Sequence, residues 1–439
     1  MAPKPMTAAD VSRLLGRAAF GATEADLDRW TGKPYADLVD ELLAVGELPV
    51  VPPQPDEARR LAIQGGNQEP GEARRWWLER MRTTPYPLLE RVTLLWHNHF
   101  ATGIRYPPQT SHLVAQNATI RTHALGDLHA LVEALTVDPA MLFWLNGTDN
   151  ATPHPNENYA REFFELFTLG TDPQVYTERD VREAARVFTG WIVNGGDTAQ
   201  FVAARHDAKT KRVLGRTVLN AGDQEYKTLV GITLAQPASP RFFARKIVAS
   251  LAYVPAANDP LVTKVANALR SRWRTADAVR ALLLADEFRY ASAARGRQYV
   301  RTPVETLVHA AKALGVAFDD GSLVWFLDRM GHSLFDPVDV SGWPLGRDWI
   351  TPVAALARYD AALALFSQAN ADRAARTLRP WPASRDVTGW ARFVGLPGVS
   401  RNTASAIGAY LRRAAKADEQ AKQQGVLALL LSSPEWLVM

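Results

Sequence analysis

Two histidines separated by one residue are the first side chains in this sequence whose types suggest chemistry. They lie in the apolar stretch Trp96-His97-Asn98-His99-Phe100. Imidazole is a common metal ligand and a common acid or base. On a helix of ~3.6 residues per turn, His97 and His99 lie about 200° apart, so both serve one site only if the helix ends or distorts there. The structural alternative for His99, which shares an apolar stripe with Leu88 and Val92, is a core histidine with one hydrogen bond.

A second polar group lies within the aromatic segment 156–167. Asn158, Glu162 and Glu165 follow the spacing i, i+4, i+7, which predicts one shared helix face. Buried carboxylates are costly unless they are paired or bind a metal, so Glu162 and Glu165 are candidates to share a cation or a proton. The structural alternative is an ion pair between Arg161 and Glu165, with an asparagine capping the helix.

The third candidate is His206, which is followed directly by Asp207. A histidine beside an aspartate is a weak signal, because a solvated turn explains it equally well. His332, near Asp336 and Asp339, is a similarly weak pattern.

The chain contains no cysteine, which excludes disulfides, thiolate metal sites and cysteine nucleophiles. Any metal must therefore be held by histidine, carboxylate or other oxygen and nitrogen ligands. The glycine-rich phosphate loops, the serine-hydrolase elbow and the His-Glu-x-x-His zinc motif are all absent. A formal net charge of +4 without a long basic run argues against a nucleic-acid partner.

Helices are the elements that must position these candidates. Val11, Leu14, Leu15 and Ala18 recur at helical spacing after a possible cap at Thr7. The same reasoning predicts helices near 34–44, 87–100, 177–190, 241–251, 275–284, 303–314, 352–367, 403–413 and 419–431. The fold class predicted is all-α, with a small β-hairpin near residues 200–218 around the polar centre 207–211. A long ordered loop rich in Trp, Pro and Gly is expected near 331–351, anchored by Trp343 and Trp349.

We expect a single helical unit over residues 1–439, with an N-terminal subregion 1–50, a core 73–367 and a C-terminal subregion 368–439. Residues 50–55 read as an extended connector. No apolar run reaches the ~18 residues of a membrane span, and no signal peptide is recognisable, so a cytoplasmic location is the default expectation.

The order of the motifs resembles that of the bacterial family known as domain of unknown function 1800. The resemblance covers nearly the whole chain and rests on residues 13–23 (RLLGRAAFGAT), 96–100, 145–147, 156–162, 165–170, 176–181, 189–191, 206–207 and 342–344. Phe163-Phe164 stands where aliphatic pairs are usual, and Val338 stands where a second proline is usual. The resemblance implies a mostly helical bacterial protein and supplies no established reaction.

Relatives of this kind are often encoded beside another family, domain of unknown function 1501, which resembles the alkaline-phosphatase and sulfatase superfamily. The resemblance therefore suggests a partner of that kind. Many relatives are exported, although this chain carries no recognisable export signal.

Two functions follow from these patterns. The first is a metal-dependent enzyme, a hydrolase or an oxidoreductase, that uses a His/Glu site in a helical core. His99, Glu162 and Glu165 would bind zinc, manganese, iron or copper, with His97 and His206 as alternates. Glu162 would also act in catalysis, and Arg161 and Asn158 would orient a carboxylate or an anionic substrate.

The second is a helical binding or scaffold protein that serves a phosphatase- or sulfatase-like partner. In that case the same polar residues form a buried network that fixes the helix register.

Overall fold

Helices make up most of the chain in the computed structural model, which confirms the all-α prediction. The structure describes residues 5–44, 70–104, 109–171, 175–194, 198–290, 297–318, 321–375 and 380–439. The predicted connector 50–55 lies outside these ranges. Among the described helices, none is long and apolar enough to cross a membrane.

The first helix begins at a capping residue that the sequence makes recognisable. Thr7 Oγ1 accepts a hydrogen bond from Asp10 N at 3.1 Å, and the Asp10 carboxylate accepts one from Thr7 N at 3.0 Å. This reciprocal capping box satisfies two backbone donors at the start of the first helix. The helices of this part are α1 (Ala8–Ala18), α2 (Glu24–Trp30), α3 (Tyr35–Leu43), α5 (Gly71–Thr83), α6 (Pro87–His99), α7 (Thr110–His123) and α8 (Leu128–Thr136).

The middle of the chain contains short helices and all of the described strands. These elements are α9 (Pro139–Trp144), η2 (Gly147–Asp149), α10 (Asn158–Glu162), the π-helix η3 (Phe163–Thr168), α11 (Glu178–Val187), β1 (Trp191–Val193), β2 (Ala199–Phe201), η4 (Ala203–Arg205), β3 (Lys211–Val213), β4 (Arg216–Val218), η5 (Gly222–Gln224) and α12 (Glu225–Leu234).

Helices return for the rest of the chain. They are α13 (Ala238–Leu251), α14 (Pro260–Arg272), α15 (Thr275–Leu283), α16 (Asp286–Arg289), α17 (Pro303–Leu314), α18 (Ser322–Arg329), η7 (Gly346–Trp349), α19 (Pro352–Ala375), α20 (Val387–Phe393), α21 (Arg401–Arg413), α22 (Glu419–Leu431) and α23 (Pro434–Leu437).

The β structure differs in detail from the predicted hairpin. A hairpin is present, but its strands β3 and β4 pair from Lys211 to Val218 and turn at Leu214 and Gly215, which have φ angles of 49° and 74°. Two consecutive residues with positive φ are typical of the tight turns that suit a twisted hairpin. Phe201 instead belongs to β2, which pairs with β1 in a separate two-stranded sheet. The polar centre 207–211 therefore leads into the first strand of the hairpin and is not its turn.

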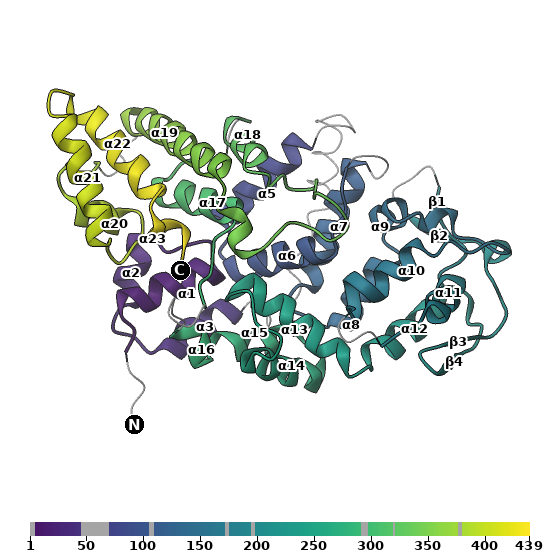
Figure 1. Cartoon of the computed structure of the whole chain (residues 1–439). Helices are drawn as coiled ribbons and strands as arrows, with labels where there is room; N and C mark the ends of the chain where they lie inside the picture. Colours follow the sequence, from purple (N-terminus) through teal and green to yellow (C-terminus); the bar gives the residue numbers. More distant parts are fainter. Residues whose placement is uncertain are drawn as a thin grey trace.

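Helix α6 is buried on all sides and joins two large apolar clusters. Its residues Leu88, Val92 and Leu95 pack into a cluster with α1, α10 and α13, whereas Leu94 packs into a second cluster with α5, α17 and α19. Figure 1 shows the C-terminal helices beside α1 and α2 at one end of the molecule and the β strands at the other. The segment bearing both histidines of the first motif therefore lies inside the protein.

The segment 331–351 is a largely irregular loop, as predicted, and its two tryptophans anchor it. Trp343 and Trp349 are 4% and 3% exposed. The loop docks on α6 through Asn98, whose Oδ1 accepts a hydrogen bond from Trp343 N at 2.6 Å and whose Nδ2 donates to Trp343 O at 3.3 Å. Gly342 has a φ of 87°, and a Cβ atom there would lie 2.3 Å from the Asn98 carbonyl oxygen. The glycine is therefore required for this close approach.

Candidate functional site

The second polar group lies on an irregular helix, not on a continuous α-helix. Asn156 Oδ1 accepts a hydrogen bond from Asn158 N, the first residue of α10, at 2.9 Å. Five residues later the chain enters η3, where Leu169 N donates to Phe164 O at 2.9 Å in the i→i+5 pattern of a π-helix. Short π segments within helices are rare and frequently occur at functional sites. The wider turn changes the direction of every side chain after Glu162, including that of Glu165.

Glu162 and Glu165 are half-buried, and neither makes a hydrogen bond or an ion pair with a described residue. The expected pair of Arg161 with Glu165 is wrong, because Arg161 instead donates to Glu178 at 2.8 Å and to Glu157 at 3.2 Å. Burial raises the pKa of the Glu162 carboxyl above its ordinary value, and the negative charge of Glu165 adds to this. The two carboxylates thus form a locally negative region.

The other two predicted residues of this group hold the helix in place. Arg161 ties α10 to α11 through Glu178, and its hydrogen bond to Glu178 raises the pKa of the guanidinium group above the ordinary value. Asn158 Nδ2 donates to Asn146 Oδ1 at 3.1 Å. Both side chains are therefore engaged with neighbouring protein groups.

Glu165 lines a cleft of about 310 Å³ between η3 and α13. Leu166, Leu169, Gly170 and Thr171 continue the wall that carries Glu165, and Ala257 adds a contact from the loop after α13. Positions 238, 241, 242, 245 and 246 supply the opposite wall, at the spacing of a single helix face. Ser239 Oγ donates to Thr168 O at 3.0 Å and holds the two walls together at one edge.

Three cations lie on the α13 wall: Arg241, Arg245 and Lys246. Arg241 donates to Ala257 O at 2.5 Å, and Arg245 donates to Ala256 O at 3.0 Å, so backbone carbonyls orient both guanidinium groups. Within the described ranges, none of the three forms an ion pair with a carboxylate. Carbonyl oxygens orient a guanidinium group without cancelling its charge, so the wall keeps its positive charge.

Lys246 is half-buried in this wall. Burial lowers the pKa of its ammonium group below the ordinary value. The ammonium group lies 5.5 Å from the centre of the Phe242 ring. Gly170, with a φ of 77°, lets η3 approach this ring, because a Cβ atom there would lie 2.8 Å from Phe242 Cδ2. The glycine that ends the 165–170 motif thus shapes the cleft.

His99 lies behind the wall of this cleft. Its Nε2 is 2.9 Å from Phe167 O, and its ring packs 5.8 Å from Phe242, centre to centre. Burial holds the pKa of His99 well below its ordinary value, and the charge of Lys246 acts in the same direction. A neutral, buried ring with one hydrogen bond matches the structural alternative for this residue.

His97 occupies a different environment on the opposite side of α6. It packs between Trp77 and Phe335, and Phe335 N donates to its Nε2 at 3.4 Å. Burial lowers the pKa of His97 to about 3, so the ring is neutral at physiological pH. His97 and His99 therefore do not face one another, as the helical spacing predicted.

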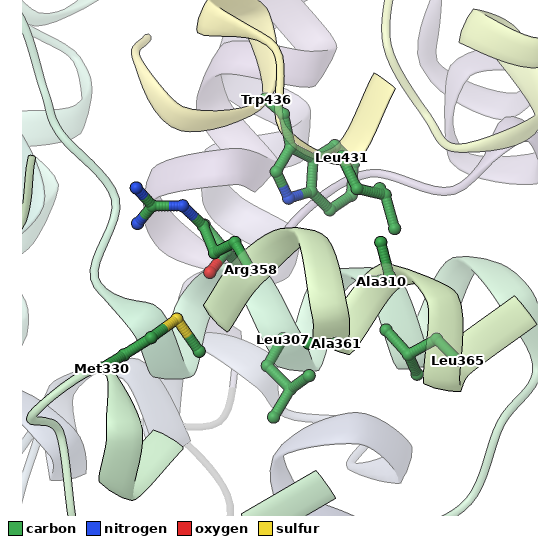
Figure 2. A pocket seen from close by; sticks show the side chains of 10 residues that line it. Leu307, Ala310, Met330, Arg358, Ala361, Leu365, Leu431 and Trp436 are labelled. Atoms are coloured by element: carbon green, nitrogen blue, oxygen red, sulfur yellow. The ribbon is translucent and has the colours of Figure 1, made fainter. Parts of the chain in front are cut away.

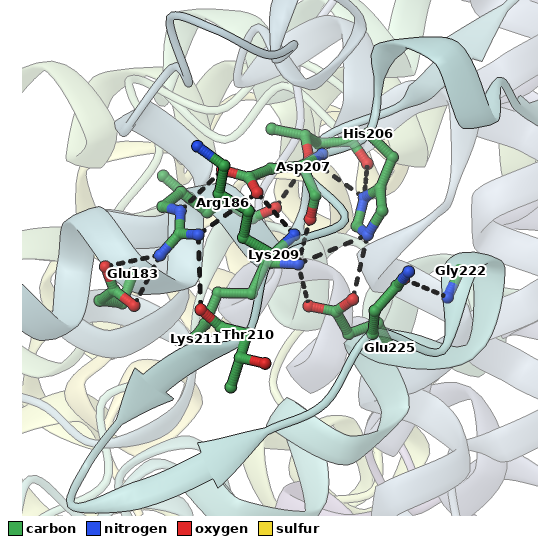
Figure 3. Close-up of polar contacts among 12 residues, drawn as sticks. Glu183, Arg186, His206, Asp207, Lys209, Thr210, Lys211, Gly222 and Glu225 are labelled. Carbon is green, nitrogen blue, oxygen red and sulfur yellow. Dashed lines mark hydrogen bonds and ion pairs between the residues drawn. The ribbon is translucent and has the colours of Figure 1, made fainter.

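His206 lies in a third place, within a buried ionic network (Figure 3). Its Nε2 lies 3.0 Å from Glu225 Oε2, and its Nδ1 lies 2.9 Å from Thr189 O. Lys211 Nζ pairs with Glu225 Oε1 at 2.5 Å, and both of these side chains are fully buried. Asp207 pairs with Arg186 at 2.8 Å. The network joins β3 to α12, and both nitrogens of His206 are engaged in it.

The five residues proposed as metal ligands are thus distributed over separate places. Glu162 and Glu165 lie together, whereas His99, His97 and His206 are in three other environments. Among the residues that the structure describes, no three or more histidine or carboxylate side chains are grouped so that they could hold a metal ion. The charge of Asp339, in the 331–351 loop, also contributes to the raised pKa of Glu162.

A separate cavity between α17, α19 and the C-terminal helices is part of the core (Figure 2). Its volume is about 20 Å³, which is room for about one water molecule. Leu307, Ala361, Leu365 and Leu431 line it, and Arg358 lies at its edge. This cavity is too small for a ligand.

Sequence reasoning missed the cationic wall of the cleft. The segment Arg241-Phe242-Phe243-Ala244-Arg245-Lys246 carries basic residues at i, i+4 and i+5 around an aromatic pair. That spacing places Arg241 and Arg245 on one face of a helix. These residues would form an ordinary solvated helix face if η3 did not lie opposite them and close the cleft.

Comparison with known proteins agrees with the order of motifs along the chain. No curated protein and no solved structure matches the chain. The family described as protein of unknown function, DUF1800, matches residues 13–438. This match includes α10, η3, α13 and the 331–351 loop. The chain therefore belongs to the DUF1800 family.

Proposed function

We propose that this protein binds a small anionic molecule in the cleft between η3 and α13. The observation that carries the proposal is the set of three cations, Arg241, Arg245 and Lys246, that line one cleft without a carboxylate partner among the described residues. Charge-assisted hydrogen bonds from such groups are the usual means of holding carboxylates and phosphates. The cleft volume of about 310 Å³ lies at the lower end of the range for small-molecule sites.

The surroundings of the other polar motifs support a binding role. His97, His99 and His206 are each enclosed by protein groups. Among the candidate residues from the sequence, Glu165 in the cleft is therefore more accessible to a ligand than these histidines. Lys246 would bind an anion favourably, because a bound negative charge would offset the free-energy cost of burying its ammonium group.

Calorimetric titration with inorganic phosphate tests this proposal. Lys246→Met removes one charge without removing a protein hydrogen bond, and we expect about tenfold weaker binding from the loss of one charge-assisted contact. Arg270→Gln is the matched control, because Arg270 is an exposed cation on neighbouring α14 outside the cleft. Equal affinity in the native protein and in Lys246→Met, or no binding of phosphate, sulfate or acetate to the native protein, would count against the cleft.

The second candidate function is a metal-dependent enzyme. The observation in its favour is the pair Glu162 and Glu165, which makes no hydrogen bond or ion pair with a described residue. Burial and the charge of Glu165 raise the pKa of Glu162. Such a pair would bind a divalent cation, with water or substrate completing the coordination. Metal analysis of the purified protein tests this candidate. We expect a stoichiometric transition metal that is lost in Glu162→Gln, and a metal-free native protein with unchanged thermal stability in a chelator would exclude it.

A partner enzyme from the domain of unknown function 1501 family fits the first candidate. Phosphatases and sulfatases release anions and act on anionic esters, which are the ligands that the cleft would hold. Co-purification of the two proteins tests this, and recovery of no complex at micromolar concentrations contradicts it.

A further inference from the structure

The cleft is lined by opposite charges that do not neutralise one another. Glu165 lies on the η3 wall, and the three cations lie on the α13 wall. No ion pair joins Glu165 to any of these cations within the described residues. On a solvated surface, keeping opposite charges apart costs little free energy. In this protein the opposite charges line one cleft, and backbone carbonyl groups orient two of the three cations.

Each wall is held by contacts that keep these charges apart. Arg241 and Arg245 bond the carbonyl groups that follow α13, which turns both guanidinium groups along their own wall. The π-helix fixes Glu165 through the bond from Leu169 N to Phe164 O and through Thr168 Oγ1, which donates to Phe163 O at 2.5 Å. The charges are therefore preorganised on two walls.

We infer that the cleft recognises a dipolar ligand that carries an anionic group and a protonated amine. This inference rests on the proposed function and extends it from an anion to a zwitterion. The anionic group would contact Arg241, Arg245 and Lys246, and the ammonium group would donate to Glu165. The nearby carboxylate of Glu162 adds negative potential on the same side. Such a ligand satisfies both walls at once, which neither a simple anion nor a simple amine can do.

The apolar part of the lining sets the size of the ligand. Phe242, Leu166 and Leu169 lie among the charged groups, so the two charges of the ligand are joined by a short apolar linker. A cleft of about 310 Å³ suits a small molecule of this kind better than a folded protein segment.

Calorimetric titration with four probes tests the inference: O-phosphoethanolamine, β-alanine, inorganic phosphate and ethanolamine. We expect O-phosphoethanolamine to bind at least tenfold more tightly than phosphate if the anionic group is a phosphate. If the anionic group of the ligand is a carboxylate, we expect β-alanine to bind more tightly than O-phosphoethanolamine. Glu165→Gln should remove the advantage of the dipolar probe without weakening the binding of phosphate. Glu133→Gln, a half-buried carboxylate on α8 outside the cleft, is the matched control.

The outcomes separate this inference from the proposed function. If phosphate binds as tightly as both dipolar probes, the dipolar ligand is excluded and the anion site stands. If Glu165→Gln keeps the preference, Glu165 does not bind the amine and the inference fails. If no probe binds the native protein, both proposals fail. Circular dichroism and the melting temperature of Glu165→Gln show whether a loss of binding reflects a loss of fold.

Discussion

Asp138 is a buried carboxyl group without a cationic partner among the described residues, and it predicts how the stability of this protein depends on pH. It is 6% exposed and caps α9, accepting hydrogen bonds from Met141 N at 3.1 Å and from Gln116 Nε2 at 2.8 Å. Burial raises the pKa of this carboxyl from 3.8 to about 7, even though the hydrogen bonds oppose the shift. The perturbation that we propose is Asp138→Asn, which keeps an oxygen acceptor for both donors and cannot ionise.

The sign and the size of the effect follow from the raised pKa. The folded protein favours the protonated acid, so the stability that Asp138 contributes is present below about pH 4 and is lost as the pH rises through about 7. A shift of about three pKa units corresponds to about 4 kcal/mol, at about 1.4 kcal/mol per unit. Asp138→Asn should therefore match the native protein near pH 4 and exceed its free energy of unfolding by up to about 4 kcal/mol above pH 7.

Urea unfolding followed by tryptophan fluorescence, at steps of about one unit between about pH 4 and 8, measures this difference. The control is Asp127→Asn, since Asp127 is an exposed N-cap of α8 and accepts a hydrogen bond from His129 N at 2.8 Å. Asn caps a helix about as well as Asp, so we expect the control to change the free energy of unfolding by less than about 1 kcal/mol. A difference for Asp138→Asn that does not change with pH would refute the reasoning, because it would mean that Asp138 ionises at the same pH in the folded and unfolded chains.

Two further substitutions test how the loop and the ionic network contribute to stability. Gly342→Ala should lower the free energy of unfolding by about 2 kcal/mol or more, because a Cβ atom would meet Asn98 at 2.3 Å in addition to straining a φ of 87°. Gly331→Ala, at a φ of 80° with no atom within 4 Å, should cost only about 1 kcal/mol, and equal melting temperatures for the two variants would contradict this. Glu225→Gln should cost about 3 kcal/mol in urea unfolding, since it leaves the fully buried Lys211 unpaired, and an unchanged midpoint would show that the ion pair is not formed.

Local patterns in the sequence predicted the elements and the burial of single residues well. The Thr7 cap is present, and Asp10 completes its capping box. His99 is buried as its apolar stripe indicated, and the tryptophans of the 331–351 loop are buried as expected. These features depend on neighbours within one turn or on burial alone, and the sequence carries that information directly.

Features that depend on distant residues were not predictable in the same way. Glu178 is seventeen residues from Arg161 and displaces Glu165 as its partner. The π-helix follows from packing and not from any propensity for i→i+5 bonding, so Glu165 turns towards α13. Arg241 and Lys246 become part of a site only when α13 meets η3. For these residues the chemistry was visible in the sequence, but the place where they converge was not.

The bond between Asn98 and Trp343 has a consequence for synthesis of the chain. These residues are 245 positions apart. The ribosome adds about 5–20 residues per second, so the loop that covers α6 is synthesised about 12–50 s after α6 itself. During that interval Trp77 and the ring of His97 lack the aromatic partners Phe335 and Trp343. The nascent chain therefore has a prolonged exposure of apolar surface, which is the condition under which chaperones are needed.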